Sequence, residues 1–181
     1  MKLIIAITGA SGVAYGKRLL EICTEKKIET FLIISKAGEE VIKHELVNDN
    51  FTKLSTHRYM PNNLLVPLTS GSHVVDAMII VPASMKTVSA VANGYSENLI
   101  TRAADVQLKE KRKLIIVPRE TPLHEIHLRN LMILSQLGAI ILPAMPGFYH
   151  NPKTLNEMID FIVGKILDQI GINHELYKKW A

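Results

Sequence analysis

The sequence has few of the residues that build cross-linked, metal-bound or membrane-spanning proteins. It contains one cysteine, Cys23, and one tryptophan in 181 residues. A single cysteine excludes an intramolecular disulfide framework and a cysteine-rich zinc site, so Cys23 is expected in the core of a cytoplasmic protein. Apolar runs such as residues 139–143 are too short to cross a bilayer, and no export signal is evident at the amino terminus.

Charge of one sign is not concentrated either. The 21 Lys and Arg residues and 17 Asp and Glu residues give a net charge of +4, and the densest basic cluster is residues 109–113. There is no basic stripe interleaved with aromatic residues, so we expect neither a nucleic acid nor a membrane as partner. The positive balance suits anionic ligands such as phosphates. A hydrophobic content of 48% excludes a disordered chain.

The apolar periodicity alternates between strand and helix along the chain. It predicts strands at residues 2–8, 30–35, 77–81, 113–117 and 139–142. It predicts helices at residues 11–26, 36–47, from about 84, from 96 or 97 to 111, 122–137 and 154–170, with an irregular stretch at 48–75. This alternation is typical of a parallel α/β sheet with helices on both faces, in one domain spanning residues 1–181.

In an open parallel sheet, ligands bind outside the carboxyl ends of the strands. The segments that leave the predicted strands there are residues 8–12, 35–38, 82–87, 118–122 and 143–149. Each carries glycine, small hydroxyl residues, or charges next to proline. We therefore expect the binding site to lie among these five loops.

The first of these loops, Gly9-Ala-Ser-Gly12, resembles a phosphate-binding turn between a strand and a helix. Free amides at the helix start and the Ser11 hydroxyl could donate to an anion, although an ordinary glycine-containing turn has the same pattern. The sequence is not G-x-G-x-x-G, and Ser35 followed by Lys36 stands where a dinucleotide site requires an acid. A mononucleotide phosphate therefore fits better than NAD.

Two later loops carry further polar groups. Ser84 could simply cap the following helix. Arg119 and Glu120 follow a buried strand side by side, and they indicate either a ligand site or a salt-bridged helix start.

Two other constellations carry less weight. His124 and His127 share a helix face but have no third ligand at a recognisable spacing, so a structural or surface role is favoured over a metal site. Arg102 and Lys109 lie two turns apart on one helix face, where they either line an anion pocket or face solvent.

Eight motifs occur in order along the chain: residues 7–12 (ITGASG), 35–37 (SKA), 70–72 (SGS), 82–87 (PASMKT), 101–105 (TRAAD), 108–110 (LKE), 118–123 (PRETPL) and 146–150 (PGFYH). Together they resemble the UbiX-type flavin prenyltransferases. The resemblance implies a flavodoxin-like, three-layer α/β fold and a homododecamer with sites between subunits. It also implies that a dimethylallyl group is joined to N5 and C6 of reduced FMN, without a metal. The product, prenylated FMN, would serve a UbiD-type decarboxylase.

The same resemblance implies roles for individual residues. FMN would be held by Gly9, Ala10, Ser11, Ser35, Ser84, Met85, Lys86, Thr87 and Arg119. Dimethylallyl phosphate would be surrounded by Arg102, Lys109, Tyr149, Lys165 and Trp180, with Glu45 reaching in from a neighbouring subunit. Glu120 would be the catalytic acid and base. Lys165 stands where many members have arginine, so its phosphate contact would be a point charge rather than a bidentate pair.

The chemistry of such a transfer suits these residue types. Cations stabilise the departing phosphate, and the aromatic rings of Tyr149 and Trp180 can face a developing allyl cation. Glu120 can accept the proton lost from C6 or protonate the phosphate.

Three alternatives remain open at this point. The first, an FMN-dependent cysteine decarboxylase, would need a histidine after the first helix and an asparagine-rich loop, and neither is in the corresponding place. The second is direct decarboxylation of aromatic acids, and the third is a non-catalytic FMN carrier.

Overall fold

The computed structural model describes residues 1–47 and 49–180 and contains one six-stranded sheet. Every neighbouring pair of strands is parallel, in the order β3-β2-β1-β4-β5-β6. The strands are β1 (Lys2–Ile7), β2 (Glu29–Ile34), β3 (His57–Tyr59), β4 (Ala77–Ala83), β5 (Lys113–Pro118) and β6 (Ile140–Ile141). Without the edge strand β3, the order is that of flavodoxin, which confirms the predicted fold class.

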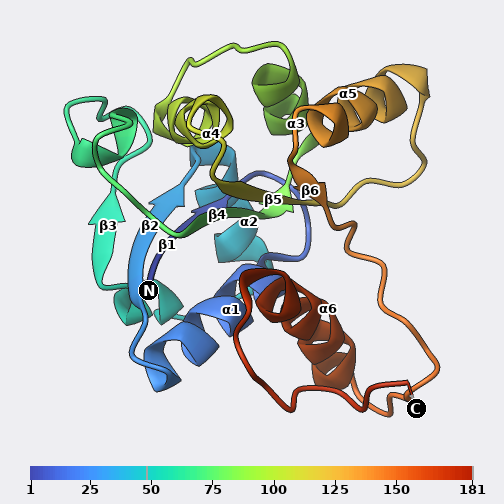
Figure 1. Cartoon of the computed structure of the whole chain (residues 1–181). Helices are drawn as coiled ribbons and strands as arrows, with labels where there is room; N and C mark the ends of the chain where they lie inside the picture. The colour runs from blue at the N-terminus through green and yellow to red at the C-terminus, as the bar shows by residue number, and fades with distance from the viewer. Residues whose placement is uncertain (48, 181) are drawn as a thin grey trace.

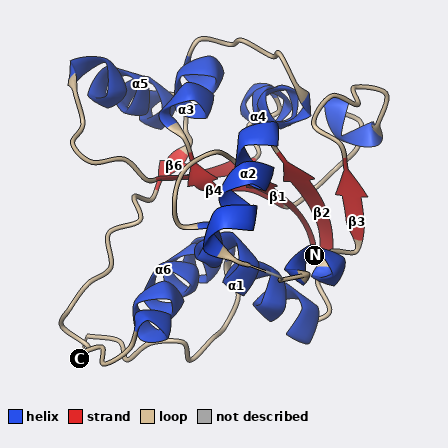
Figure 2. Ribbon diagram, turned by 180° about the vertical axis from the view of Figure 1, so that it is seen from behind, coloured by secondary structure: helices blue, strands red, loops and turns tan. Residues whose placement is uncertain are grey.

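Helices cover both faces of this sheet (Figure 1, Figure 2). They are α1 (Val13–Glu25), α2 (Lys36–Glu45), α3 (Met85–Ala92), α4 (Leu99–Lys109), α5 (Glu125–Gln136) and α6 (Leu155–Ile170), with short 3₁₀ turns η1 (Phe51–Leu54) and η2 (Pro67–Thr69). One layer contains α1 and α6, and the opposite layer contains α3, α4 and α5. Within the described residues, no helix is both long and apolar enough to span a membrane.

The two layers follow from the alternation of side chains along each strand. In β1, Leu3, Ile5 and Ile7 pack with α1 and α6, whereas Ile4 and Ala6 pack with α3 and α4. All five of these side chains are buried, as expected for central strands that are covered on both faces. Cys23 is fully buried in the first of these cores, as predicted.

The two central strands are tied together at their carboxyl ends. The backbone amide and the hydroxyl of Thr8 both donate to the Pro82 carbonyl, at 3.2 and 2.9 Å. The Thr8 hydroxyl oxygen in turn accepts from the Ser84 amide at 2.7 Å. The loops after β1 and β4 are therefore held in fixed positions on either side of the gap between them.

One strand was not predicted. The stretch 48–75 was expected to be irregular, yet His57–Tyr59 pairs with β2 as the edge strand β3. Two of its three residues are exposed, so it lacks the apolar alternation that identifies a buried strand.

Three helices begin two or three residues later than the periodicity predicts. α1 begins at Val13 rather than Ser11, because Gly12 adopts a left-handed conformation with φ of 99°. α4 begins at Leu99, because the Asn98 side chain accepts from the amides of Ile100 and Thr101 and so caps the helix. α5 begins at Glu125 rather than residue 122, and the intervening segment continues the loop that leaves β5.

Candidate active site

A crevice lies at the carboxyl edge of the sheet, where the strand order reverses between β1 and β4. It encloses about 340 Å³ and is lined by Gly9, Ser35, Lys36, Ala37, Pro61, Asn62, Ser84, Lys86, Thr87, Glu97 and Asn98. We call this pocket the switch crevice. Open α/β sheets bind their ligands at this position, because helix starts and loop amides converge there.

The loop after β1 passes very close to the start of α2. A Cβ atom at Gly9 would lie 2.5 Å from the Cβ of Ala37, so the crevice wall has no room for a side chain at this position. Ala10, the next residue, is buried. Of residues 9–11, Gly9 lines the crevice and so presents only backbone there, and Ser11 is exposed.

Two serines begin the helices that flank the crevice, and they were predicted to contact FMN. Ser35 Oγ accepts from the Gly38 amide at 3.0 Å, at the start of α2. Ser84 Oγ lies 3.4 Å from the Thr87 amide, which donates to it, and 3.1 Å from the Thr87 hydroxyl, at the start of α3. Since Ser35 accepts a hydrogen bond from the backbone, its hydroxyl hydrogen remains able to donate to a phosphate or ribityl oxygen. This donor set fits FMN.

The loop at residues 9–12, predicted to bind a phosphate, differs from the expectation in one respect. Its helix-start amides were expected to be free for an anion, but Glu45 accepts from the amides of Gly12 and Val13, at 2.9 and 3.1 Å to the same oxygen. A carboxylate of the chain itself therefore takes the favourable position at the start of α1. That Glu45 reaches a neighbouring subunit stays a prediction, since its contacts in one chain are with this loop.

Arg119 and Glu120 leave β5 with separate partners. Arg119 Nε donates to the Ser11 carbonyl at 3.3 Å, which joins the β5 loop to the β1 loop. Glu120 is exposed, and its Oε1 accepts from the next amide, that of Thr121, at 3.1 Å. Because α5 begins only at Glu125, these two residues do not form a salt-bridged helix start. The Glu120 carboxylate is thus available to a ligand.

The remaining residues predicted to hold FMN lie on α3. Met85 is 8% exposed and packs into the core, so only its backbone is placed to meet a ligand. Lys86 lines the crevice and forms an ion pair with Glu97 at 3.7 Å, with its side chain 83% exposed. This lysine can therefore turn toward an anion at little cost.

A second group of predicted site residues lies around α6. Tyr149 meets Trp180 edge-on at 5.3 Å between ring centroids and Phe161 at 5.8 Å. Lys165 Nζ stands 5.6 Å from the Phe161 ring centre and 5.1 Å from that of Tyr177. We call Tyr149, His150, Phe161, Tyr177 and Trp180 the aromatic cluster. The structure thus brings three of the predicted substrate residues, Tyr149, Lys165 and Trp180, to one place.

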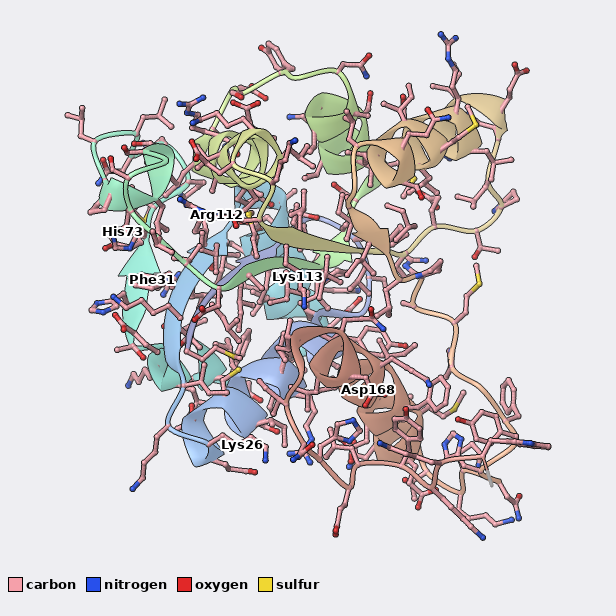
Figure 3. The ribbon with its side chains drawn as sticks, in the orientation of Figure 1. Lys26, Phe31, His73, Arg112, Lys113 and Asp168 are labelled. Atoms are coloured by element: carbon pink, nitrogen blue, oxygen red, sulfur yellow. The ribbon has the colours of Figure 1, made fainter. Side chains whose placement is uncertain are left out.

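The two predicted cations on α4 lie elsewhere. Arg102 donates to the Thr69 carbonyl at 3.2 Å and pairs with Asp105 at 2.7 Å. Lys109 pairs with Glu110 beside Gly71. The adjacent Arg112 donates to the backbone carbonyls of Gly71 and His73 (Figure 3). In one chain these cations hold the 69–73 loop and do not line the switch crevice.

His124 caps the start of α5 and His127 lies in its first turn, so the two rings meet without a third ligand among the described residues. The rings of His124 and His127 stack at 3.5 Å between centroids. Within residues 1–47 and 49–180, no group of three or more potential ligands could hold a metal ion.

Sequence reasoning missed part of the crevice wall. Pro61 and Asn62 come from the stretch that was expected to be irregular, and Asn98 caps α4. The Pro61 carbonyl accepts from the Leu99 amide at 2.8 Å, which fixes this stretch against the helix start. Asn98 could have been found from its capping chemistry, but the position of Pro61 depends on a contact 38 residues away in sequence.

Known proteins resemble this chain along its whole length. The Flavoprotein family model matches residues 1–169. The chain is 52% identical to flavin prenyltransferase UbiX of Methanocaldococcus jannaschii, over all of this chain and 99% of that protein. It is 45% identical to the mitochondrial flavin prenyltransferase PAD1 of Saccharomyces cerevisiae, over 99% of this chain and 75% of that protein.

Solved structures agree with the sequence relatives. A dodecameric FMN-dependent UbiX-like decarboxylase from Escherichia coli O157:H7 superposes with a TM-score of 0.97, at 40% identity over the whole of both chains. AnUbiX in complex with FMN and dimethylallyl pyrophosphate has the same TM-score at 39% identity, over 99% of this chain and 97% of that one. The peptidyl-cysteine decarboxylase EpiD, at 18% identity and a TM-score of 0.65, shares the fold alone. The chain therefore belongs to the Flavoprotein family and, within it, to the UbiX-type flavin prenyltransferases.

Proposed function

We propose that this chain joins the dimethylallyl group of dimethylallyl phosphate to N5 and C6 of reduced FMN. The observation that carries the proposal is the switch crevice of glycine and hydroxyl groups beside Arg119 and Glu120, in a chain that superposes on a complex with FMN and dimethylallyl pyrophosphate. The cysteine decarboxylases share only the fold with this chain, so they give no comparable support.

Flavin binding would use the residues around the crevice. Ser35, Ser84 and Thr87 offer hydroxyls, Lys86 offers a mobile charge, and Gly9 leaves room for the ligand to approach the backbone. Arg119, fixed on the Ser11 carbonyl, adds a cation at the edge of the β1 loop. Ala10, Ser11 and Met85 would contribute mainly through their backbone.

Reduced FMN, when bound, supplies the nucleophilic nitrogen and ring carbon. Glu120 would act as the base that accepts the C6 proton, and as the acid that returns a proton to the phosphate. Among the described residues, its exposed carboxylate accepts one hydrogen bond, from the neighbouring Thr121 amide, so it can turn toward a ligand. Lys165 would hold the phosphate as a point charge, and Tyr149 and Trp180 would exclude water from the allyl group.

The position of Lys109 on α4 supports a site that is shared between two copies of the chain. α4 begins at the crevice with Asn98 as its cap and runs toward the amino edge of the sheet, where β5 begins at Lys113. Lys109, at the far end of this helix, is about 15 Å from its first residue at 1.5 Å per residue, so it cannot line its own crevice. We propose that Arg102, Lys109 and Glu45 complete the site of a neighbouring subunit.

The surface of α5 supports such an assembly. Ile126 is 63% exposed and Met132 is 55% exposed, which is unusual for large apolar side chains on one helix. The similar chain from Escherichia coli O157:H7 is dodecameric, and we propose a homododecamer here as well. Light scattering tests this directly, because a fully active monomer would contradict the proposal.

The product is proposed to pass to a UbiD-type decarboxylase, and the protein to act in the cytoplasm. A single buried cysteine suits a reducing compartment. Cell fractionation tests the location, and activation of a flavin-free decarboxylase by the purified product tests the recipient.

A mass spectrum tests the central proposal. The protein would be incubated with reduced FMN and dimethylallyl phosphate, with the allyl substrate omitted in the control. We expect a flavin whose mass has increased by one dimethylallyl unit, less the protons lost. Unmodified flavin that is bound but never altered would instead support a carrier, and carbon dioxide released from an aromatic acid would support a decarboxylase.

A further inference from the structure

The segment that follows α6 folds back along the helix. Gly171, with φ of 73°, ends α6 in a left-handed conformation, and the chain then returns past it (Figure 1). The return is very close. A Cβ atom at Gly164 would lie 2.6 Å from Cε1 of Tyr177 and 2.7 Å from Cε1 of His174. Because only glycine leaves this space, the tail and the helix pack together as one unit.

Asp168 is the centre of the polar contacts between the tail and the helix (Figure 3 labels it on α6). The Tyr177 hydroxyl donates to Oδ2 of Asp168 at 2.7 Å. His174 Nε2 lies 3.2 Å from Oδ1, and His174 Nδ1 accepts from the Leu176 amide at 3.2 Å. In neutral His174 the ring proton is therefore on Nε2, which donates to Asp168. Each carboxylate oxygen thus holds one side chain of the tail.

The electrostatics agree with an ionised carboxylate. Partial burial raises the pKa of Asp168, but the hydrogen bonds from Tyr177 and His174 and the charge of Lys179 outweigh it, and the pKa ends below its usual value. Hydrogen bonding with the Tyr177 side chain raises the pKa of Lys165, so this lysine stays charged as well. The His174 side chain is only 2% exposed and that of Asp168 is 29% exposed, so the contact is buried on the histidine side and reaches solvent on the carboxylate side.

The two ends of this network meet the proposed substrate site. The Tyr177 ring lies under the ammonium of Lys165 at 5.1 Å, and Trp180, three residues further on, meets Tyr149. We infer that Asp168 is a positioning residue that fastens the tail to α6 through Tyr177 and His174, and thereby places both Lys165 and Trp180 for the allyl phosphate. The placement of substrate rests on the proposed function, whereas the fastening of the tail does not.

Two variants separate positioning from folding. Tyr177→Phe keeps the ring under Lys165 but removes the hydroxyl, and with it the hydrogen bonding to both Asp168 and Lys165. Asp168→Asn keeps the shape of the side chain but removes its charge. Tyr59→Phe, on the distant edge strand β3, is the matched control for loss of a tyrosine hydroxyl. Melting curves of all three proteins confirm that the fold is intact, and Asp168→Asn serves as the test if Tyr177→Phe fails to fold.

Trp180 is the only tryptophan, so its emission anisotropy reports on the tail alone. On the flavin-free full-length protein, we expect lower anisotropy and about tenfold faster tryptic cleavage after Lys178 and Lys179 in Tyr177→Phe and Asp168→Asn. With substrates present, we expect KM for dimethylallyl phosphate to rise about tenfold, while kcat and FMN affinity change by less than about threefold. Tyr59→Phe should match the unaltered chain in every measurement.

The outcomes distinguish the two proposals. If the unaltered chain prenylates FMN but both variants keep its anisotropy, cleavage rate and KM, the positioning inference is wrong and the function stands. If the unaltered chain never prenylates FMN, the proposed function is wrong, and the tail measurements decide the fastening on their own. If a variant shows lower anisotropy and faster cleavage of the tail but an unchanged KM for dimethylallyl phosphate, the fastened tail does not place the substrate, and that part of the inference is wrong.

Discussion

The switch crevice is lined mostly by backbone and short side chains, with Lys36, Lys86 and Glu97 as its long ones, whereas the aromatic cluster consists of ring side chains from a loop, a helix and the tail. In the crevice, Gly9, Ser35 and Ser84 take their positions directly from the strand ends and helix starts. Around α6, Tyr149 and Trp180 come from segments that the sheet does not fix. The proposed flavin site, set by strand ends and helix starts, and the proposed allyl site, set by a loop, a helix and the tail, are thus built in different ways on one scaffold.

A change at Glu120 should have the largest effect, because Glu120 lies between the two regions. It follows β5, and in the sheet β5 lies between the crevice strand β4 and β6. Glu120→Gln keeps the size of the side chain but cannot accept a proton. Single-turnover prenylation of prebound reduced FMN should slow by a factor of about 10² to 10⁴, or about 3 to 5.5 kcal/mol. FMN affinity should stay unchanged, because most of the residues proposed to bind FMN line the switch crevice, which Glu120 does not line.

Glu125→Gln is the matched control, because Glu125 is an exposed acid in the first turn of α5. It should turn over at the normal rate. A near-normal single-turnover rate in Glu120→Gln, with weakened FMN binding, would show that Glu120 is structural.

A change at Lys165 tests the proposed allyl site without touching the switch crevice. Lys165→Met keeps an unbranched chain over Phe161 and Tyr177 but removes the charge. A hydrogen bond to a charged group contributes about 1.5–3 kcal/mol, so KM for dimethylallyl phosphate should rise about 10-fold to 100-fold with little change in FMN affinity. Steady-state kinetics beside an FMN titration measures both, and Lys53→Met on η1 controls for lost surface charge. An equal loss of FMN affinity would contradict the separation of the two regions.

A change at Gly9 tests the switch crevice. Gly9→Ala places a methyl group 2.5 Å from the Ala37 Cβ, and overpacking of this kind costs about 1–3 kcal/mol. We expect weaker FMN binding and a lower melting temperature. Ala37→Gly in the same chain restores the space, so the double variant should recover most of the loss. FMN binding in Gly9→Ala that equals the unaltered chain would show that the loop yields easily.

The same contrast explains what the sequence could predict. The crevice loops are local: a strand, a turn residue and a capping serine lie within a few residues, so Gly9, Ser35 and Ser84 could be located from the pattern. The rest depends on distant contacts. Glu45 reaches the Gly12 amide from 33 residues away, and β3 is identified only by its pairing with β2. The ion pairs of α4 likewise give no periodic signal.

The smallest effects are expected in the core beneath both regions, where Cys23 can be probed with a thiol reagent. Cys23 packs in one cluster with Ile7, which precedes the β1 loop, and with Phe161 of the aromatic cluster. Burial raises the pKa of Cys23 to about 12, so the reactive thiolate is roughly one part in 10⁴ at pH 8. We expect almost no reaction with a thiol reagent at pH 8 in the native protein, and one thiol per chain in urea, measured by absorbance.

Because the raised pKa disfavours the thiolate, labelling of Cys23 should increase with pH well beyond pH 9. Lys165→Met should leave the rate unchanged, whereas Gly9→Ala should accelerate it as local opening becomes easier. Fast labelling of the unaltered native chain would show that the two regions share no closed core.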